Sequence, residues 1–483
     1  MPDPSAQLAE IKRSLQRIWG YEDFRPLQLE VITSILAGQD SLVIVSTGGG
    51  KSLCFQLPAI MQQGLTLVIS PLLSLIENQV QELRHKKLPA AALHSAMATS
   101  QRRQVLSSLS QLRLLYLSPE TLLSPTVWQK LLEPQIQIKA LIVDEAHVLV
   151  QWGDRFRPDF RRLGAVRASL TKNANQPSIA AFTATANPQA QAQLINCLQL
   201  VQPQQIITSP YRSNLALKVA IAWTAQQRKT ATLEFVRRHG HQSGLIYVRS
   251  RRSTEEIAAW LGTLGMKTKP YHAGLVSTER RQIEQDWQSG QLPLVVATSA
   301  FGMGIDKANV RWVLHFQPPL TLAEYIQEVG RAGRDRALAE ALMLVSEPTG
   351  LLDGSDRAQR EFYLSAAAKQ QQQAQALLTK LPRRGSYTEL SPQFANLDLL
   401  LGLLHSANQL IWHSPFEFEI LCSPNFQFAP PDRSPLLEMQ DFINTKTCRW
   451  AFLVKAFGFS HEAQNLKCGI CDRCLAQAKS AKG

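Results

Sequence analysis

The sequence predicts an α/β fold with two tandem parallel-sheet domains, followed by a small helical module that binds a metal. Three observations support this prediction. Short runs of Val, Ile and Leu alternate with helical segments in two successive sets, as is typical of strands buried on both faces of a parallel sheet. A turn with three consecutive glycines follows the first run, and four of the seven cysteines lie in the last 40 residues.

The length and charge limit the possible functions. A chain of 483 residues is too long for one core, so several domains are expected. The net charge of +13 favours a polyanionic partner, although a protein that is merely basic is the alternative. The apolar stretch Leu65–Ile76 is interrupted by Ser and Pro and is shorter than the roughly 20 residues of a membrane span. We therefore expect no membrane association. The protein should be cytoplasmic, and in the nucleoid if the source is prokaryotic. In that compartment the cysteines are expected to bind metal or to be buried thiols.

The apolar runs define the expected strands. The first set lies at Leu42–Ser46, Leu65–Ser70, Leu112–Ser118, Ala140–Asp144 and Ile179–Thr183. The second set lies at Gly244–Val248, Leu294–Thr298, Trp312–Phe316 and Ala341–Val345. Their division predicts one domain over residues 1–208 and another over 209–346. Ligands of such sheets bind beyond the carboxyl ends of the strands.

The glycine-rich turn directly follows the first expected strand. Its residues are Ser46, Thr47, Gly48, Gly49, Gly50, Lys51 and Ser52. Glycines let backbone N–H groups face phosphate oxygens, and the following helix adds its dipole. Lys51 would contact the β and γ phosphates, and the Ser52 hydroxyl would bind Mg²⁺. Val45 stands where the strict pattern has glycine, and a simple tight turn is the alternative, but the Lys-Ser pair favours ATP binding.

An acidic pair follows another expected strand. Asp144 and Glu145 come after Leu141–Val143, so Asp144 would hold Mg²⁺ and Glu145 would polarise the attacking water. A solvated acidic pair is the alternative. In the second domain, Arg331 and Arg334 lie three residues apart, one turn after Gln327. We expect these arginines to meet the γ phosphate of ATP bound between the two domains, although a basic helix face would look the same.

Six segments occur in a fixed order along the chain: STGGGKS, DEAH, FTATA, YHAGL, ATSAFGMGIDKANVRWVLHF and QEVGRAGRD. This is the order found in superfamily 2 helicases, and the chain more narrowly resembles the RecQ family of DNA helicases. GYEDFRPLQ and QWGDRFRPDF resemble the adenine-recognition segment and the aromatic-rich loop of RecQ proteins. The resemblance implies two RecA-like domains and an ATP- and Mg²⁺-dependent helicase that moves 3′ to 5′ on single-stranded DNA. An RNA helicase, and a translocase with weak strand separation, are the alternatives.

The resemblance also implies roles for individual residues. Around the nucleotide it assigns Tyr21 and Arg25 to the two faces of adenine, Gln28 to its edge, Asp306 to nucleotide binding, and His147 and Gln327 to catalysis. For DNA it assigns Trp152, Phe156, Arg157 and Thr298. Trp152 and Phe156 can stack on bases without reading sequence, whereas hydrophobic packing is the alternative. Arg249 either contacts phosphate or lies in solvent.

Cysteines near the C-terminus follow the pattern C-x19-C-x2-C-x2-C, at Cys448, Cys468, Cys471 and Cys474. Four thiolates suit a tetrahedral structural Zn²⁺, and an iron–sulfur cluster is the alternative. The spacing resembles the RecQ zinc module, which favours zinc. The module is expected over residues 448–483.

The segment 347–447 is longer than the zinc module requires. A Gln-rich helix is expected at Ala366–Leu378, a basic loop at Leu381–Pro392, a helix at Leu397–Gln409 and a hairpin at Leu410–Leu421. A helix followed by a hairpin indicates an inserted winged-helix-like unit, about residues 383–428. It would replace the C-terminal winged helix that the family usually has.

In this hypothesis Arg383, Arg384 and the hairpin tip near His413 face DNA, and a packing role is the alternative. The expected partners of the whole protein are single-stranded DNA and forked or tailed duplexes. Single-strand-binding and repair proteins are further candidates, and the protein is expected to be a monomer.

Overall fold

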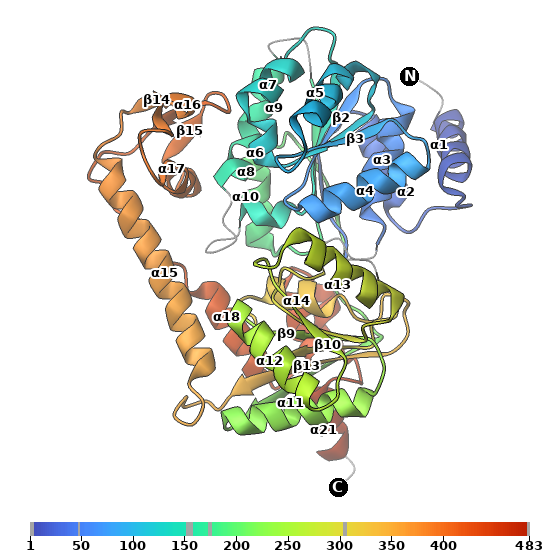
Figure 1. Ribbon diagram of the computed structural model, residues 1–483, viewed down its shortest axis with the longest axis vertical. Coiled ribbons are helices and arrows are strands. Elements are labelled where there is room, and N and C mark those ends of the chain that lie inside the picture. The colour runs from blue at the N-terminus through green and yellow to red at the C-terminus, as the bar shows by residue number, and fades with distance from the viewer. Residues whose placement is uncertain (1–3, 47–48, 151–157, 172–175, 303–306, 481–483) are drawn as a thin grey trace. The chain divides into compact units, whose positions relative to one another are not determined.

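The computed structural model describes residues 4–46, 49–150, 158–171, 176–302 and 307–480 (Figure 1). Backbone contacts divide the chain into two units. The first consists of Met1–Val45, Gly49–Thr208 and Ala366–Pro430, and the second of Ser46–Gly48, Ser209–Ser365 and Pro431–Gly483. The chain therefore returns to the first unit after it has formed the second sheet.

The first unit contains a seven-stranded sheet in the order β3-β4-β2-β5-β6-β1-β7, in which all paired neighbours are parallel. Its strands are β1 (Ser41–Ile44), β2 (Leu65–Ile69), β3 (Ala90–Leu93), β4 (Leu114–Leu117), β5 (Ile138–Val143), β6 (Ser178–Thr183) and β7 (Gln204–Ile207). Successive side chains enter opposite cores: Leu42 and Ile44 pack in one, and Val43 in the other. This two-sided burial explains why the central strands are continuously apolar.

Helices cover both faces of this sheet (Figure 1). They are α1 (Pro4–Trp19), α2 (Gln28–Leu36), α3 (Lys51–Met61), α4 (Leu73–His85), α5 (Thr99–Ser107), α6 (Pro119–Leu122), α7 (Pro125–Leu131), α8 (Pro158–Arg161), α9 (Val166–Thr171) and α10 (Pro188–Leu198). Short 3-10 turns lie at Leu109–Gln111, Ala146–Leu149 and Leu163–Ala165. Phe55 of α3 meets Phe182 of β6 edge-on, with ring centroids 5.3 Å apart.

The second unit contains a six-stranded parallel sheet in the order β10-β11-β9-β12-β13-β8. Its strands are β8 (Leu215–Ala222), β9 (Gly244–Tyr247), β10 (Thr268–Tyr271), β11 (Leu294–Ala297), β12 (Trp312–His315) and β13 (Ala339–Ser346). The helices of this sheet are α11 (Ala225–His239), α12 (Arg251–Thr263), α13 (Ser277–Ser289) and α14 (Leu322–Val329). The prediction of two parallel-sheet domains is confirmed.

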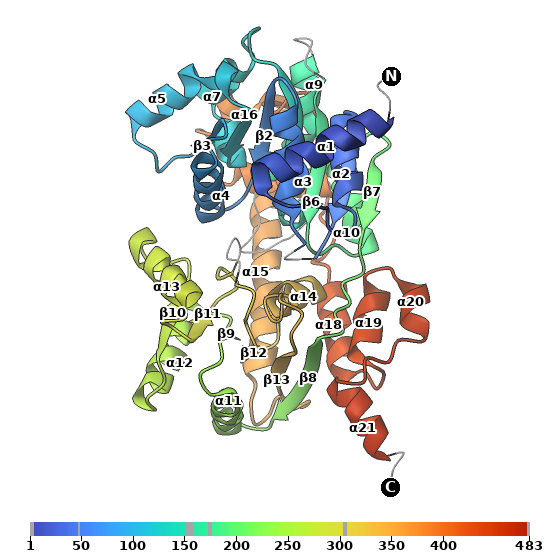
Figure 2. The ribbon, with the colours of Figure 1, turned by 90° about the vertical axis from the view of Figure 1, so that its right-hand side faces the viewer.

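The C-terminal helices belong to the second unit and lie beside β8 and β13 (Figure 2). They are α18 (Ser434–Asn444), α19 (Arg449–Ala456), α20 (Ser460–Gln464) and α21 (Asp472–Ser480). The indole N–H of Trp450 donates to the Leu215 carbonyl at 2.8 Å, and Phe442 packs on Tyr325 with centroids 4.9 Å apart. Their apolar side chains join the core of the second sheet, so this module and the sheet form one folded body.

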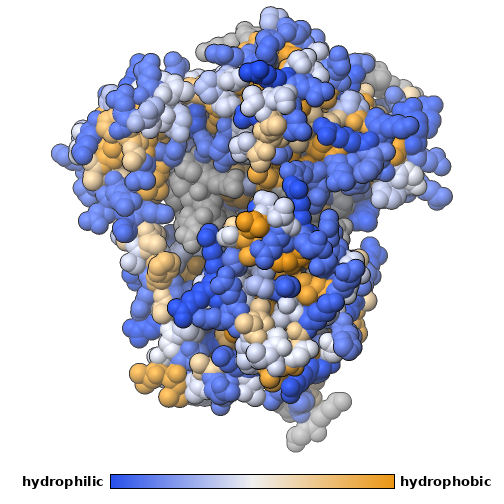
Figure 3. Space-filling view, in the orientation of Figure 1, coloured by the Kyte–Doolittle hydropathy of each residue, from blue (hydrophilic) through white to orange (hydrophobic). Residues whose placement is uncertain are grey.

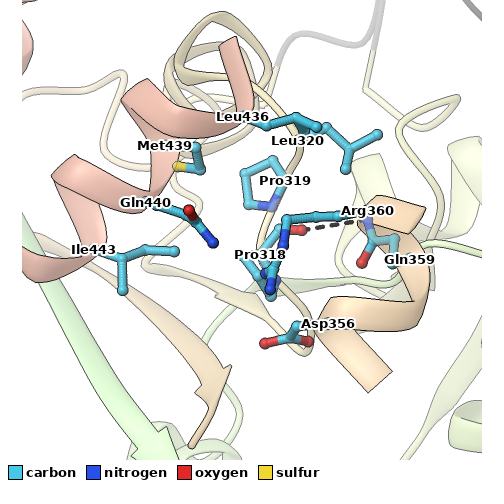
Figure 4. Close-up of a pocket in the computed structure, with 10 residues that line it drawn as sticks. All are labelled: Pro318, Pro319, Leu320, Asp356, Gln359, Arg360, Leu436, Met439, Gln440 and Ile443. Carbon is cyan, nitrogen blue, oxygen red and sulfur yellow. Dashed lines mark hydrogen bonds between the residues drawn. The ribbon is translucent and has the colours of Figure 1, made fainter. Parts of the chain in front are cut away.

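A small pocket marks where α18 meets the start of α15 (Ser355–Leu378) and the loop before α14 (Figure 4). Its walls include Pro318, Met439 and Ile443. The Gln359 amide donates to the Pro318 carbonyl at 3.5 Å. This contact fixes the first turns of α15 to the second unit.

Residues 366–430 form a separate cluster within the first unit. After α15 come β14 (Arg384–Ser386), α16 (Tyr387–Leu390), α17 (Leu397–Ser406), β15 (Leu410–Trp412) and β16 (Glu417–Ile420). The antiparallel sheet has the order β14-β16-β15, and the leucines of α17 pack with Trp412 and Phe418 in one core. This order of helices and strands is that of a winged helix. The expected basic loop at 381–392 was wrong, because β14 and α16 occupy it.

The tip of the β15–β16 hairpin packs on the helices of the first sheet. Phe416 meets Trp128 edge-on at 5.6 Å between ring centroids. The Arg162 side chain, 3% exposed, donates through Nε to the Pro415 carbonyl at 2.7 Å and lies 3.8 Å over the Tyr387 ring. Pro415 and Phe416 are therefore packed against the helices of the first sheet, whereas His413, which the hypothesis names, is 47% exposed.

The exposed basic residues of this cluster bind a carboxylate of the chain. Arg384 and His413 contact the Glu419 carboxylate at 2.8 and 3.0 Å, and Arg383 lies 3.8 Å from it. The arginines are nevertheless 73–74% exposed, so they remain accessible to an anionic partner.

The surface in Figure 3 is mostly hydrophilic, with apolar residues in small groups. Within the described part of the chain, no helix combines the length and the apolar character that a membrane crossing requires.

Candidate active site and metal centre

The glycine-rich turn leads directly into α3, which begins at Lys51. Gly50 has a φ of +74°, and a Cβ there would lie 2.5 Å from Nε2 of Gln28. The positive φ favours glycine at this position, and a larger residue would also displace the Gln28 amide. Gln28 donates from Nε2 to the carbonyls of Gly50 (3.1 Å) and Gly49 (3.4 Å). Thr47 and Gly48 lie outside the described residues.

The segment before α2 contacts the glycine-rich turn through Gln28. Its Oε1 accepts the backbone N–H of Arg25 at 2.9 Å, so the amide joins the expected adenine segment to the turn. Tyr21 is 55% exposed, and Arg25 is also exposed. Both side chains are accessible to a ligand, whereas the Gln28 amide already binds backbone groups.

The acidic pair lies at the carboxyl end of β5, in the middle of the first sheet. The Asp144 N–H donates to the Ile69 carbonyl at 2.8 Å, and the Asp144 carboxylate accepts the Glu145 N–H at 3.0 Å. Glu145 has a φ of +51°, a left-handed conformation that is costly for residues other than glycine and is often found at active sites. Glu145 Oε1 lies 3.9 Å from the Lys51 Nζ. The fold thus brings together residues separated by more than 90 positions of sequence.

Charges at this edge of the sheet are incompletely compensated. Burial, and secondly the neighbouring Glu145 carboxylate, raise the pKa of Asp144 to about 7, although Lys51 opposes the shift. The buried Lys51 ammonium makes no hydrogen bond to the described residues. A phosphate would supply acceptors to Lys51, and a divalent cation would stabilise the Asp144 carboxylate. Carboxylate and hydroxyl oxygens are the ligands that Mg²⁺ prefers, so Asp144 and Ser52 fit this ion.

Two contacts near the acidic pair were not predicted. The His147 Nδ1 lies 3.1 Å from the Thr183 hydroxyl and 3.3 Å from Glu145 Oε2, so His147 connects the acidic pair with the end of β6. The Ser52 hydroxyl accepts a hydrogen bond from Gln79 of α4 at 3.0 Å. Thr183 lies in the FTATA segment, which marks it as a candidate, whereas no local pattern singles out Gln79.

The expected residues of the second unit lie around the end of its sheet. Gln327 and Arg331 are buried, and Arg334 is half-buried. The Arg331 guanidinium donates to the Gly302 carbonyl, and the Gln327 amide nitrogen has no hydrogen-bond partner in the described chain. Thr298 is half-buried just after β11. Trp152, Phe156, Arg157 and Asp306 lie outside the described residues.

The cysteines form a cluster that fits a metal. The Sγ atoms of Cys448, Cys468, Cys471 and Cys474 all lie within 4.8 Å of one another, and those of Cys468 and Cys474 are 3.9 Å apart. Zn–S bonds of about 2.3 Å in a tetrahedron place sulfurs about 3.8 Å apart. The N–H groups of Cys468, Cys471 and Cys474 each donate to a cluster sulfur at 3.4 Å, which favours thiolates. The cysteines are free of disulfides, so the donor set could hold zinc.

Known proteins resemble this chain over nearly its whole length. The DEAD/DEAH box helicase family model matches residues 25–194, and the helicase conserved C-terminal domain model matches residues 227–336. The ATP-dependent DNA helicase RecQ of Synechocystis is 47% identical over 97% of this chain and 99% of its own length. The RecQ helicase of Haemophilus influenzae is 41% identical, over 68% of this chain and 52% of the relative.

Solved structures share the fold at low sequence identity. The helicase MrfA bound to DNA has a TM-score of 0.59 at 18% identity, covering 89% of this chain and 65% of that chain. The yeast protein Dbp5 bound to RNA and ADP BeF3 has a TM-score of 0.57 at 14% identity, covering 73% of this chain and 90% of that chain. Together with the full-length similarity to the Synechocystis protein, the family models identify the chain as a member of the RecQ family of superfamily 2 helicases.

Proposed function

We propose that this protein is an ATP-dependent DNA helicase that moves 3′ to 5′ along single-stranded DNA. It would separate duplex strands during repair, recombination or replication-fork maintenance. One observation carries the proposal. The buried Lys51 ammonium and the Glu145 carboxylate lie 3.9 Å apart at the carboxyl edge of a parallel sheet, where a phosphate and an attacking water need opposite charges. The name of the Synechocystis relative supports the same activity.

In this proposal Lys51 neutralises the β and γ phosphates of ATP, and Glu145 orients the water that attacks the γ phosphorus. Asp144 and Ser52 would hold Mg²⁺, which supplies positive charge to the phosphate oxygens when it is bound. Arg331 and Arg334 stabilise the charge that develops on the transferred phosphoryl group, with Gln327 beside them. His147 transmits changes at Glu145 to the end of β6.

Other residues are proposed to contact the adenine of ATP and the DNA. Tyr21 and Arg25 flank the adenine, Gln28 contacts its edge, and Asp306 adds to nucleotide binding. Trp152, Phe156, Arg157 and Thr298 contact single-stranded DNA by stacking and by backbone contacts that do not depend on sequence.

The four cysteines hold a structural Zn²⁺. Single-strand-binding and repair proteins are candidate partners of a monomeric enzyme.

A translocase with weak strand separation is a second candidate, because one observation favours it. Phe416 and Pro415, at the tip of the winged-helix-like hairpin, pack on Trp128 and Arg162. A hairpin held in this way cannot insert between the strands of a duplex. Strand separation would then depend on another surface or on release of the tip.

Unwinding of duplexes with a single 3′ or 5′ tail distinguishes these functions. We expect unwinding from the 3′ tail only, and ATP hydrolysis that single-stranded DNA stimulates more than RNA of the same sequence. Lys51→Ala should lower the rate of ATP hydrolysis at least about 100-fold, since the positive charge that neutralises the phosphates is lost. Lys86→Ala, at an exposed lysine, is the control.

Each outcome has a separate meaning. Hydrolysis without unwinding favours the translocase, and stronger stimulation by RNA favours an RNA helicase. Near-normal hydrolysis by Lys51→Ala overturns the assignment of the site.

A further inference from the structure

A buried ion pair in the second unit lies outside the residues assigned to the reaction. Arg249 follows the carboxyl end of β9, and its side chain is only 12% exposed. Its Nη2 donates to Glu328 Oε2 at 2.9 Å and its Nη1 to Glu328 Oε1 at 3.4 Å. Glu324, one turn earlier on α14, lies 3.7 Å from the same guanidinium. Neither sequence-based expectation for Arg249, a phosphate contact or solvent exposure, describes this arrangement.

Glu328 also receives a hydrogen bond from the opposite side. His315 ends β12, is fully buried and lies with Nε2 2.9 Å from Glu328 Oε2. Burial alone would raise the pKa of Glu328, but Arg249 and then His315 outweigh it and hold that pKa at about 2. Burial lowers the pKa of His315, so a neutral imidazole donates to the carboxylate at neutral pH. The Arg249 charge is thus matched by one carboxylate that stays ionised.

The backbone of Glu328 leads directly to the proposed catalytic arginine. The Arg331 N–H donates to the Glu328 carbonyl at 3.3 Å, in the turn that follows α14. Because α14 spans only Leu322–Val329, its last turn depends on side-chain contacts for a fixed position. The bidentate contact from Arg249 is one of them. The Arg331 guanidinium itself then donates to the Gly302 carbonyl.

We propose that Arg249 is a positioning residue for ATP hydrolysis, which acts by fixing Glu328 and the turn that carries Arg331. The proposal rests on the function proposed for Arg331 above. It assigns Arg249 to the rate of hydrolysis and not to DNA affinity. A guanidinium is required, since a lysine keeps the charge but cannot form the two parallel hydrogen bonds.

Arg249→Gln, Arg249→Lys and Glu328→Gln test this role. The measurements are kcat and KM for ATP at saturating single-stranded DNA, and the DNA dissociation constant by fluorescence anisotropy. We expect Arg249→Gln and Glu328→Gln each to lower kcat about 10-fold, with KM and DNA affinity within about twofold, because small displacements of a catalytic group are costly. Arg249→Lys should lower kcat about threefold. The double variant Arg249→Gln, Glu328→Gln should lose no more than either single change.

Arg252→Gln is the matched control. Arg252 pairs with Glu256 at 2.6 Å on α12, but its side chain is 87% exposed. This variant should retain the wild-type kcat, KM and DNA affinity. Thermal unfolding shows whether each variant is folded. If Arg249→Gln does not fold, the kcat of folded Arg249→Lys tests the proposal instead.

Two results overturn the proposal. One is an unchanged kcat in folded Arg249→Gln and Arg249→Lys. The other is weaker DNA binding with a normal kcat, which would make Arg249 a phosphate contact. Arg331→Ala separates this failure from that of the proposed function: a normal kcat in Arg331→Ala refutes the role of the arginine itself.

Discussion

Asp144 and Glu328 are both buried carboxylates near the carboxyl ends of parallel strands, one in each unit, but their surroundings differ. The pKa of Asp144 is raised to about 7, because burial and Glu145 outweigh Lys51. The pKa of Glu328 is held at about 2, because Arg249 and His315 outweigh burial. The chain itself compensates the charge of Glu328, whereas Asp144 needs a cation. This difference separates an ion pair that the chain compensates itself from a proposed ligand site.

The same distinction applies to the cations. Arg249 has a bidentate carboxylate partner. Arg162 forms an ion pair with Asp159 at 2.7 Å and packs over the faces of aromatic rings. Lys51 has only a distant carboxylate and no hydrogen bond to the described residues. We therefore expect substitutions at compensated charges to lower stability. Substitutions at uncompensated charges should lower activity without lowering stability.

The cysteine cluster should show the largest effect, since folding of the C-terminal module depends on the zinc that we propose it holds. Cys471→Ser should abolish binding of one zinc per chain and unfold the C-terminal module. Metal binding contributes on the order of 10 kcal/mol in small zinc modules. Because Cys471 is fully buried in the core shared with the second sheet, that sheet should lose stability too.

Metal analysis and thermal unfolding measure these effects. Cys422→Ser, outside the cluster, is the control and should keep its zinc. A folded Cys471→Ser protein without metal would show that the cluster is not structural, and iron in place of zinc would favour the alternative cluster.

Asp144→Asn should separate activity from stability. We expect hydrolysis to fall about 100- to 1000-fold, since an amide cannot hold the metal charge. Without nucleotide and Mg²⁺, the free energy of unfolding at pH 7.5 should rise by about 1–2 kcal/mol, because a disfavoured buried charge is removed. Steady-state hydrolysis and urea unfolding measure the two effects. A variant that is both inactive and less stable would contradict the comparison.

Glu328→Gln should destabilise the protein, in addition to lowering kcat. Removing one partner of a buried ion pair costs about 3 kcal/mol at neutral pH. The folded pKa of about 2 lies below the ordinary glutamate pKa of 4.5, so the ion pair stabilises the fold above pH 4.5. This contribution is lost as the pH falls from 4.5 towards 2. Urea unfolding at pH 7.5 and at about pH 3 should therefore show the stabilities of wild type and variant converging at acid pH. A difference that is independent of pH would exclude this linkage.

Phe416→Ala should give the smallest effect, since it tests an apolar contact beside the compensated Arg162. The half-buried ring packs on Trp128, and its loss should cost about 1–2 kcal/mol. Ile411→Ala, on the same hairpin at 44% exposure, is the control and should change stability by less than about 0.5 kcal/mol. Urea unfolding measures stability, and the number of base pairs unwound per ATP shows whether release of the tip changes strand separation. Equal effects of the two changes would mean that the tip is not docked in solution.

The strands that sequence patterns predicted and the strands that they missed differ in their place within the sheets. Every predicted apolar run is a strand of the structure, and all of them lie inside the sheets. The missed strands of the parallel sheets are the four edge strands, β3, β7, β8 and β10. An edge strand has only one neighbouring strand, so β7 can begin with two glutamines and β10 can contain Pro270. β3 is fully buried and β8 is mostly apolar, so apolar character alone does not distinguish these two strands from other segments.

The sequence by itself determined the parts of this protein in which chemistry depends on local spacing. The phosphate turn before Lys51, the acidic pair after β5 and the Cys-x2-Cys-x2-Cys pattern each place their ligands within a few residues. Tertiary structure decided the pairings between distant positions. Arg249 meets Glu328 across 79 positions, and Arg162 meets Pro415 across 253. The balance of a buried charge depends on all groups that surround it, and only the folded chain brings those groups together.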